Sequence, residues 1–160
     1  MVRKARQNLT KTGFKNIEFI QGDIEEMPLP DNSFDVVISN CVLNLVTDKQ
    51  KVFSEIYRVL KPGGHFCISD VVTSGDLPKK LRETAEMYAG CVSGATEKQE
   101  YLKIIGMQGF FQIESHKEKP VVIPENVLAN CLDEYELGKF KNSGSGIYSI
   151  TVTAKKLLKN

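Results

Sequence analysis

The sequence lacks the charge imbalance that marks surfaces for nucleic acids or anionic membranes. Its 160 residues carry a net charge of +1, and no basic run exceeds two residues. It also lacks any apolar stretch near the roughly 18 residues that a membrane span needs, and its first residues contain no apolar signal core. We therefore expect a cytoplasmic protein that binds neither nucleic acid nor membrane.

Paired cysteines are missing as well. The four cysteines lie far apart, without a CxxC pair or the spacing of a zinc site. In a reducing cytoplasm we expect thiols, each serving either packing or chemistry. No glycine-rich stretch opens a helix in the way a phosphate-binding loop requires, and Lys61-Pro62-Gly63-Gly64 predicts a helix stop followed by a turn.

The hydrophobic pattern predicts a single α/β domain over residues 1–160. Strand-like and helix-like stretches alternate over residues 1–110, which favours a parallel sheet with crossover helices. Residues 111–160 predict a strand, a helix and an alternating strand, typical of an antiparallel edge pair. We expect helices over residues 1–12, 47–60, 76–87, 96–106 and from 124 through Tyr135, and strands over 16–21, 34–39, 66–72, 110–122 and 148–154. Capping boxes at Thr47 and Thr96 mark two of the helix starts.

The rest of the chain is organised around the stretch Phe34–Asn44, FDVVISNCVLN. Its consecutive β-branched residues predict a strand that is buried on both faces. The strand runs directly into the polar turn Asn40-Cys41. Because ligands of open α/β sheets bind beyond the carboxyl ends of the strands, an amide and a thiol are expected at a ligand crevice.

Several motifs in order resemble those of the class I S-adenosylmethionine-dependent methyltransferases. They are GDIEEMPLPDNSFDVVIS, a helix ending RVLKPGG and a strand ending SD, all within residues 17–72. Within that superfamily, SNCVLNL followed about fifty residues later by AGCVSGA is similar to the arsenite methyltransferases. The resemblance covers essentially the whole chain. It implies a Rossmann-like sheet, S-adenosylmethionine as cofactor, arsenite or its thiol conjugate as substrate, and a role in arsenic detoxification.

The resemblance also exposes missing parts of the family pattern. The glycine-rich loop that cradles the methionine end of the cofactor, the acidic residue that holds its ribose and a further N-terminal cysteine would all precede Met1. The first helix has no N-cap and starts as if already inside a helix. The chain therefore resembles the C-terminal two-thirds of such an enzyme, and we expect it to bind the cofactor weakly or not at all.

The family motifs imply that Cys41 and Cys91 are the catalytic residues and the ligands of As(III). Trivalent arsenic is soft and prefers thiolate sulfur, so convergent cysteines near a sulfonium methyl group would hold it for methyl transfer. The alternative is that both are small buried hydrophobic residues, the commonest fate of a cysteine that forms no disulfide. We interpret Cys67, inside a strand, and Cys131, on an apolar helix stripe, as packing residues.

Five further residues correspond to cofactor contacts in the family: Asp23, Ile24, Glu25, Asn40 and Val42. By resemblance, residues 23–25 would meet the adenine, Asn40 would lie under the methionine part and Val42 would pack beside the cofactor. Without the resemblance, the residue pattern indicates simpler roles. Gly22-Asp23 would form an ordinary turn, Asn40 would end the strand with an Asx turn, and Val42 would be a core residue.

Two rival functions remain open. One is a methyltransferase of the same fold for a small organic acceptor, as in quinone biosynthesis. The other is a non-catalytic interaction or scaffold chain. An exposed sheet edge with an apolar patch can pair with another strand, and a homodimer is the simplest such pairing.

Overall fold

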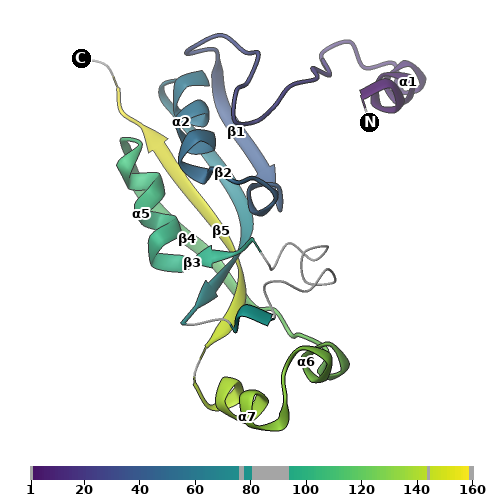
Figure 1. Ribbon diagram of the computed structural model, residues 1–160. Coiled ribbons are helices and arrows are strands. Elements are labelled where there is room, and N and C mark those ends of the chain that lie inside the picture. Colours follow the sequence, from purple (N-terminus) through teal and green to yellow (C-terminus); the bar gives the residue numbers. More distant parts are fainter. Residues whose placement is uncertain (1, 76–77, 81–93, 144, 159–160) are drawn as a thin grey trace.

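A mixed sheet forms the centre of the computed structural model, which describes residues 2–75, 78–80, 94–143 and 145–158 (Figure 1). Within these residues the strand order is β1-β2-β5-β4, and the short β3 also pairs with β2. β1 and β3 run parallel to β2, whereas β5 runs antiparallel to both β2 and β4. The predicted α/β fold with an antiparallel C-terminal pair is confirmed. The strands are β1 (Phe34–Asn40), β2 (Leu60–Ser74), β3 (Thr96–Glu97), β4 (Phe110–Pro120) and β5 (Gly146–Lys156).

The described helices are α1 (Val2–Thr12), the 3-10 helix η1 (Leu43–Leu45), α2 (Lys49–Val59), α5 (Lys98–Met107), α6 (Glu125–Cys131) and α7 (Glu134–Asn142). The predicted helix over 76–87 falls largely outside the described residues. Every helix in the described part of the chain is too short or too polar to cross a bilayer.

The main core lies between the sheet and the helices α2 and α5. Alternate residues of β2 are buried from Gly64 to Asp70, and Phe66 and Ile68 among them belong to the core that includes α2 and α5. The ring of Phe53 on α2 lies 5.7 Å from that of Phe66 and 5.5 Å from that of Tyr101 on α5, measured between centroids. Such aromatic pairs contribute roughly 0.5–1.5 kcal/mol each beyond the area they bury. The core therefore fixes α2 and α5 on the sheet.

The N-cap residues of the two core helices are acidic residues and not threonines. Asp48 caps α2 by accepting from the Lys51 N–H at 2.9 Å. Glu97 caps α5 by accepting from the N–H groups of the second and third helical residues. The capping boxes predicted at Thr47 and Thr96 are therefore wrong. A charged acceptor binds the free N–H groups at a helix start more strongly than a hydroxyl does.

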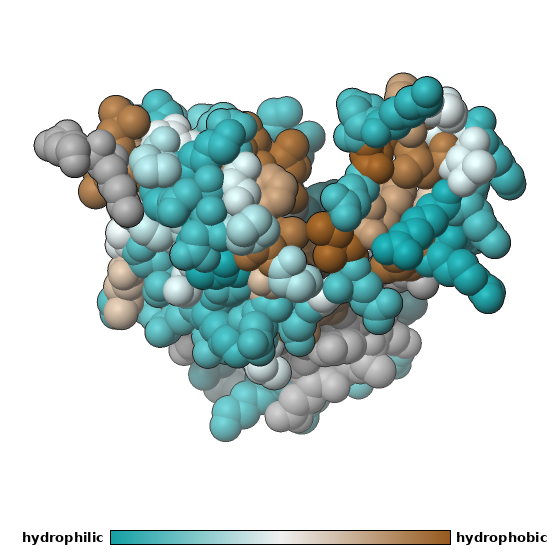
Figure 2. Space-filling model, turned by 90° about the horizontal axis from the view of Figure 1, so that it is seen from above, coloured by the Kyte–Doolittle hydropathy of each residue, from teal (hydrophilic) through white to brown (hydrophobic). Residues whose placement is uncertain are grey.

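The predicted burial of β1 on both faces is wrong. Phe34, Val36 and Ile38 are 38%, 42% and 78% exposed on one face of the strand. β1 hydrogen-bonds only with β2 among the described residues, and the strand predicted over 16–21 does not form beside it. A strand needs a hydrogen-bonded neighbour, and residues 17–20 have none in the described sheet. Figure 2 shows apolar side chains along the hollow between the sheet and the arm that carries α1.

The C-terminal region contains two helices where one was predicted. α6 ends at Cys131, and Asp133 begins α7 with a capping box to Glu136. Tyr135, expected on a continuous apolar face, is 80% exposed as a result. Leu128, Cys131 and other apolar residues form a second buried cluster with Val71 at the end of β2. The two helices therefore lie near the carboxyl ends of the strands (Figure 1).

Candidate functional site

A strained turn carries Cys41 directly beyond the end of β1. The backbone of Cys41 has a φ of 53°, in the left-handed region that residues with a side chain rarely adopt. Its N–H donates to the carbonyl of Ser69 on β2 at 2.9 Å. The half-buried side chain packs against the second cluster. Backbone strain of this kind concentrates at functional sites, and it makes this turn the centre of the candidate site.

The segment that follows Cys41 is also anchored on β2. Asn44 in η1 is 3% exposed, and its Nδ2 donates to the carbonyl of Val71 at 2.6 Å. Leu43 is fully inside the main core. The turn therefore has two bonds to the same strand, and β2 fixes its position.

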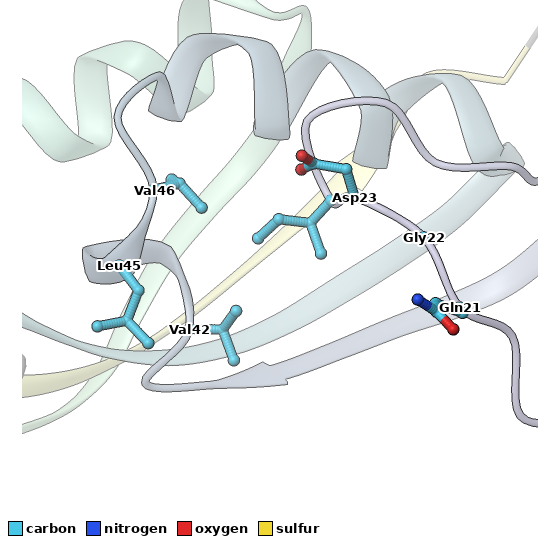
Figure 3. Close-up of a pocket in the computed structure, with 7 residues that line it drawn as sticks. Gln21, Gly22, Asp23, Val42, Leu45 and Val46 are labelled. Carbon is cyan, nitrogen blue, oxygen red and sulfur yellow. The ribbon is translucent and has the colours of Figure 1, made fainter. Parts of the chain in front are cut away.

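An open cleft of about 760 Å³ lies beside this segment (Figure 3). One wall is the segment after β1, with Val42, Leu45 and Val46. The opposite wall is the loop Gln21–Ile24, which carries the carboxylate of Asp23. The cleft therefore combines one apolar wall with an acidic group on the opposite wall.

A tight turn fixes the loop that carries Asp23 in the wall of the cleft. The N–H of Glu25 donates to Asp23 Oδ1 at 2.9 Å, and the N–H of Glu26 donates to the carbonyl of Asp23 at 3.2 Å. The carboxylate of Glu25 points to the start of α2, where its Oε1 accepts from Thr47 Oγ1 at 3.3 Å and from the N–H of Asp48 at 3.2 Å. Glu25 thus ties the loop to α2.

The structure brings some of the predicted site residues together. Asp23, Ile24 and Val42 line the cleft. Asn40 is the exposed last residue of β1, paired with Ser69. Cys91 lies outside the described residues.

The two cysteines interpreted as packing residues lie in different surroundings. Cys67 is half-buried within β2, and Cys131 is buried in the second cluster. Among the described residues, no three histidine, cysteine or acidic side chains gather as a resident metal site would need.

Arg58 supports the loop beside the cleft, a structural role that the sequence did not indicate. Its guanidinium donates to both carboxylate oxygens of Glu55 at 2.7 Å each. It also donates to the carbonyls of Met27 and Leu29 and to Asp31 Oδ1. The bonds to Glu55 and Asp31 raise the pKa of Arg58 above its ordinary value. Arg58 therefore braces the loop that continues from the acidic wall, through bonds to distant residues that leave no local pattern.

The comparison with protein families decides the class of the chain. The model of the family described as "Methyltransferase domain" matches residues 1–109. The chain belongs to this family. The methyltransferase domain is also similar to a solved structure, the arsenic(III) S-adenosylmethionine methyltransferase CrArsM from Chlamydomonas reinhardtii. That likeness has a TM-score of 0.72 and 34% identity, and it covers 93% of this chain and 48% of that one. The predicted class I methyltransferase fold is thereby confirmed.

Two curated relatives differ in how much of this chain they match. An arsenite methyltransferase from Halobacterium salinarum is 35% identical over 98% of this chain and 38% of its own length. A demethylmenaquinone methyltransferase from Listeria monocytogenes is 43% identical over 44% of this chain and 30% of its own length. The chain thus spans about two-fifths of the first of these relatives.

Strand β2 carries a buried acidic side chain. Asp70 on β2 is 1% exposed and accepts from the hydroxyl of Tyr101 at 3.3 Å and from the N–H of Val71 at 2.9 Å. Burial raises the pKa of Asp70, although these bonds and the nearby Lys49 oppose the shift. Burial lowers the pKa of Lys49, partly offset by Asp70. Burial and the neighbouring Asp70 raise the pKa of Tyr101.

Proposed function

We propose that the chain is part of an arsenite methyltransferase, which transfers a methyl group from S-adenosylmethionine to thiolate-bound As(III) in arsenic detoxification. The observation that carries the proposal is the turn at Cys41. It combines a thiol, a strained backbone and a place at the carboxyl end of β1, one residue before Val42 in the wall of the cleft. The match to the arsenite methyltransferase of Halobacterium salinarum, which covers 98% of this chain and 38% of that protein, supports the same substrate.

The cleft fits the adenosine end of the cofactor. A flat aromatic base suits the apolar wall formed by Val42, Leu45 and Val46. The carboxylate of Asp23 is an acceptor for an exocyclic amine, and Ile24 adds apolar surface beside it. Asn40 at the end of β1 would contact the methionine part, whereas Glu25 would act indirectly by holding the loop on α2.

The chain's own task in the reaction is to hold the acceptor. Thiolates of Cys41 and Cys91 would bind As(III), which is soft and prefers sulfur ligands. When bound, S-adenosylmethionine supplies a methyl group that its sulfonium has already activated. The thiols would aim the arsenic lone pair at that methyl group, so positioning provides most of the acceleration.

We propose further that this chain alone binds the cofactor weakly or not at all, because the family's glycine-rich loop has no counterpart in its sequence. The chain spans 38% of the Halobacterium salinarum relative and 48% of the Chlamydomonas reinhardtii structure. Isothermal titration calorimetry with S-adenosylmethionine checks this proposal. Tight binding to the 160-residue chain would contradict it.

Removing the two thiols tests the arsenic assignment. Cys41→Ser together with Cys91→Ser is expected to weaken As(III) binding at least tenfold, because a hydroxyl is a hard and poor ligand for arsenic. Phenylarsine oxide, a trivalent arsenical that binds two thiols, is the probe, and its affinity is measured by calorimetry. Cys67→Ser is the matched control and should leave the affinity unchanged, since Cys67 lies within β2.

If the wild type and the double serine variant bind phenylarsine oxide with equal affinity, the assignment of arsenic as the substrate is wrong. Methyl transfer to arsenite that survives both serine substitutions would likewise mean that these two thiols do not hold the arsenic. The partial match to the demethylmenaquinone methyltransferase makes a quinone-like molecule the acceptor to test in that case.

The exposed face and edge of β1 support a homodimer of the isolated chain. Ile38 is 78% exposed and lies on a strand with one unpaired edge in the described sheet. Such edges pair with other strands unless charge blocks them. Ile38→Lys is therefore expected to shift gel filtration from dimer to monomer. Val122→Lys, at a residue 86% exposed outside any strand, is the control that should remain dimeric. A monomeric wild type would contradict the dimer.

A further inference from the structure

The acidic wall of the cleft packs directly against the loop that follows it. Gly22 comes immediately before Asp23 in that wall. A Cβ at Gly22 would overlap the ring of Pro28, so the backbone of Gly22 lies directly against that ring. A proline ring is rigid, because its side chain closes on its own backbone. The place of Asp23 in the wall therefore depends on the place of Pro28.

Helix α2 holds the residues on both sides of Pro28. The N–H of Met27 donates to Glu55 Oε2 at 2.7 Å. Arg58 donates to the carbonyl of Met27 at 3.0 Å and to that of Leu29 at 2.7 Å. Each of these bonds joins a backbone group of the loop to a charged side chain, and such bonds are stronger than those between neutral groups. Pro28 is therefore held between two residues that are bonded to α2.

Glu55 and Arg58 also fix each other. The guanidinium donates to both carboxylate oxygens at 2.7 Å each, and both side chains are partly buried. Two such parallel bonds set the direction of both groups. The bond from Arg58 lowers the pKa of Glu55, against the opposing effect of partial burial. The pair therefore offers the loop a fixed donor and a fixed acceptor.

The loop is tied to α2 at two separate places. Glu25 accepts bonds at the start of the helix. The Glu55–Arg58 pair bonds to the loop near the end of the helix. A segment tied at one point can pivot, whereas a second point fixes its orientation. The pair therefore sets how Asp23 faces the opposite wall, where Val42 lies (Figure 3).

We propose that Glu55 and Arg58 are positioning residues for the adenosine end of the cofactor. Through the loop that they hold, the carboxylate of Asp23 stays where it accepts a bond from the exocyclic amine of adenine. Neither member of the pair is among the described residues that line the cleft, so both act through the loop alone. This inference rests on the proposed function, which assigns the cleft to the adenosine end.

Two nucleosides test the inference with the 160-residue chain. Adenosine carries the exocyclic amine, whereas inosine has a carbonyl oxygen in its place, which a carboxylate repels. Neither contains the methionine part of the cofactor, so both report on the cleft alone. NMR titration measures the two affinities. The wild type is expected to bind adenosine about tenfold more tightly than inosine, because only adenosine donates to Asp23.

Arg58→Met is the first variant, because it keeps an unbranched apolar side chain and removes every donor. Its preference for adenosine is expected to fall to about threefold or less, while its affinity for inosine stays that of the wild type. Arg58→Lys keeps the charge on a single donor and should recover part of the preference. Lys61→Met is the matched control and should keep the full preference, because the ion pair of Lys61 joins β2 to Asp35 on β1 instead.

The same spectra give a second readout. In the wild type, adenosine should shift the amide signals of Asp23 on one wall and of Val42 on the other. In Arg58→Met the signal of Val42 should still shift, and that of Asp23 should shift less. If this variant does not fold, Glu55→Gln replaces it. Its amide still accepts from Met27 but loses the charged pair, so the preference should fall in the same direction by a smaller factor.

The outcomes separate the inference from the proposed function. If the wild type does not bind adenosine in the cleft, or binds both nucleosides equally, the assignment of the cleft to the adenosine end is wrong, and the inference fails with it. If the wild type prefers adenosine and the variants of Arg58 and Glu55 keep that preference, the inference alone is overturned. It is equally overturned if Arg58→Met weakens the binding of both nucleosides by the same factor.

Discussion

Lys156→Met is expected to lower the free energy of unfolding by about 3 kcal/mol, because it removes a buried charged donor and leaves its acceptors without that partner. Lys156 is the last residue of β5 and only 6% exposed. Its Nζ donates to Asn32 Oδ1 at 2.8 Å and to the carbonyls of Tyr57 and Leu60 at 2.7 Å each. It also lies 4.7 Å from the centre of the Tyr57 ring.

These contacts join elements that are far apart in the sequence. Tyr57 and Leu60 lie at the end of α2 and the start of β2, where a helix leaves carbonyl groups unpaired. Lys156 satisfies two of those carbonyls although it lies 99 and 96 residues further along the chain, so its side chain joins the end of β5 to the end of α2 and the start of β2. Equilibrium unfolding in urea measures the loss of free energy.

Lys155→Met supplies the control for this prediction. Lys155 neighbours Lys156 on β5 and is exposed, so its substitution should change the free energy of unfolding by less than about 0.5 kcal/mol. A loss below about 1 kcal/mol in Lys156→Met would mean that water replaces the lysine at the carbonyls.

Most of the fold could be predicted from the sequence, because the period of the hydrophobic residues indicates which side chains become buried. The sequence identified α2, α5 and the strands β2, β4 and β5. The prediction failed where a strand depends on a neighbouring strand or on a covering layer. The pattern of Val36 and Ile38 suits a strand covered on both faces, yet the described sheet leaves one face open. For the same reason residues 16–21, which have strand composition, stay outside the sheet.

The candidate site could be predicted only in part. Cys41 was expected at the carboxyl end of a strand, which the structure confirms for β1. Its left-handed backbone could not be foreseen, since nothing in the residue type favours it. The contacts of Arg58 with the loop were missed because its partner at Met27 is 31 residues away. A single lysine or arginine on a helix gives no local sign of such a bond.

Asp70→Asn is expected to stabilise the fold at pH 7, and the gain should shrink in acid. Burial raises the pKa of Asp70 above its ordinary value, against the opposing effect of Lys49 on α2 and of the bond from Tyr101 on α5. The folded state therefore holds the proton of Asp70 more tightly than the unfolded state does. Its contribution to stability is fully present below about pH 4 and is lost as the pH rises through the raised pKa.

Asparagine cannot ionise, so this loss disappears in the variant. Its amide keeps the shape of the carboxyl group: Oδ1 still accepts from the Val71 N–H, and Nδ2 can donate to the hydroxyl of Tyr101. Unfolding in urea at a series of pH values between 4 and 8 measures the difference between the two proteins. That difference should grow with pH, and Asp35→Asn, at an exposed carboxylate paired with Lys61, should show no such growth. A difference that stays constant with pH, or that favours the wild type above pH 6, would mean that the charge of Lys49 keeps Asp70 ionised in the fold at little cost.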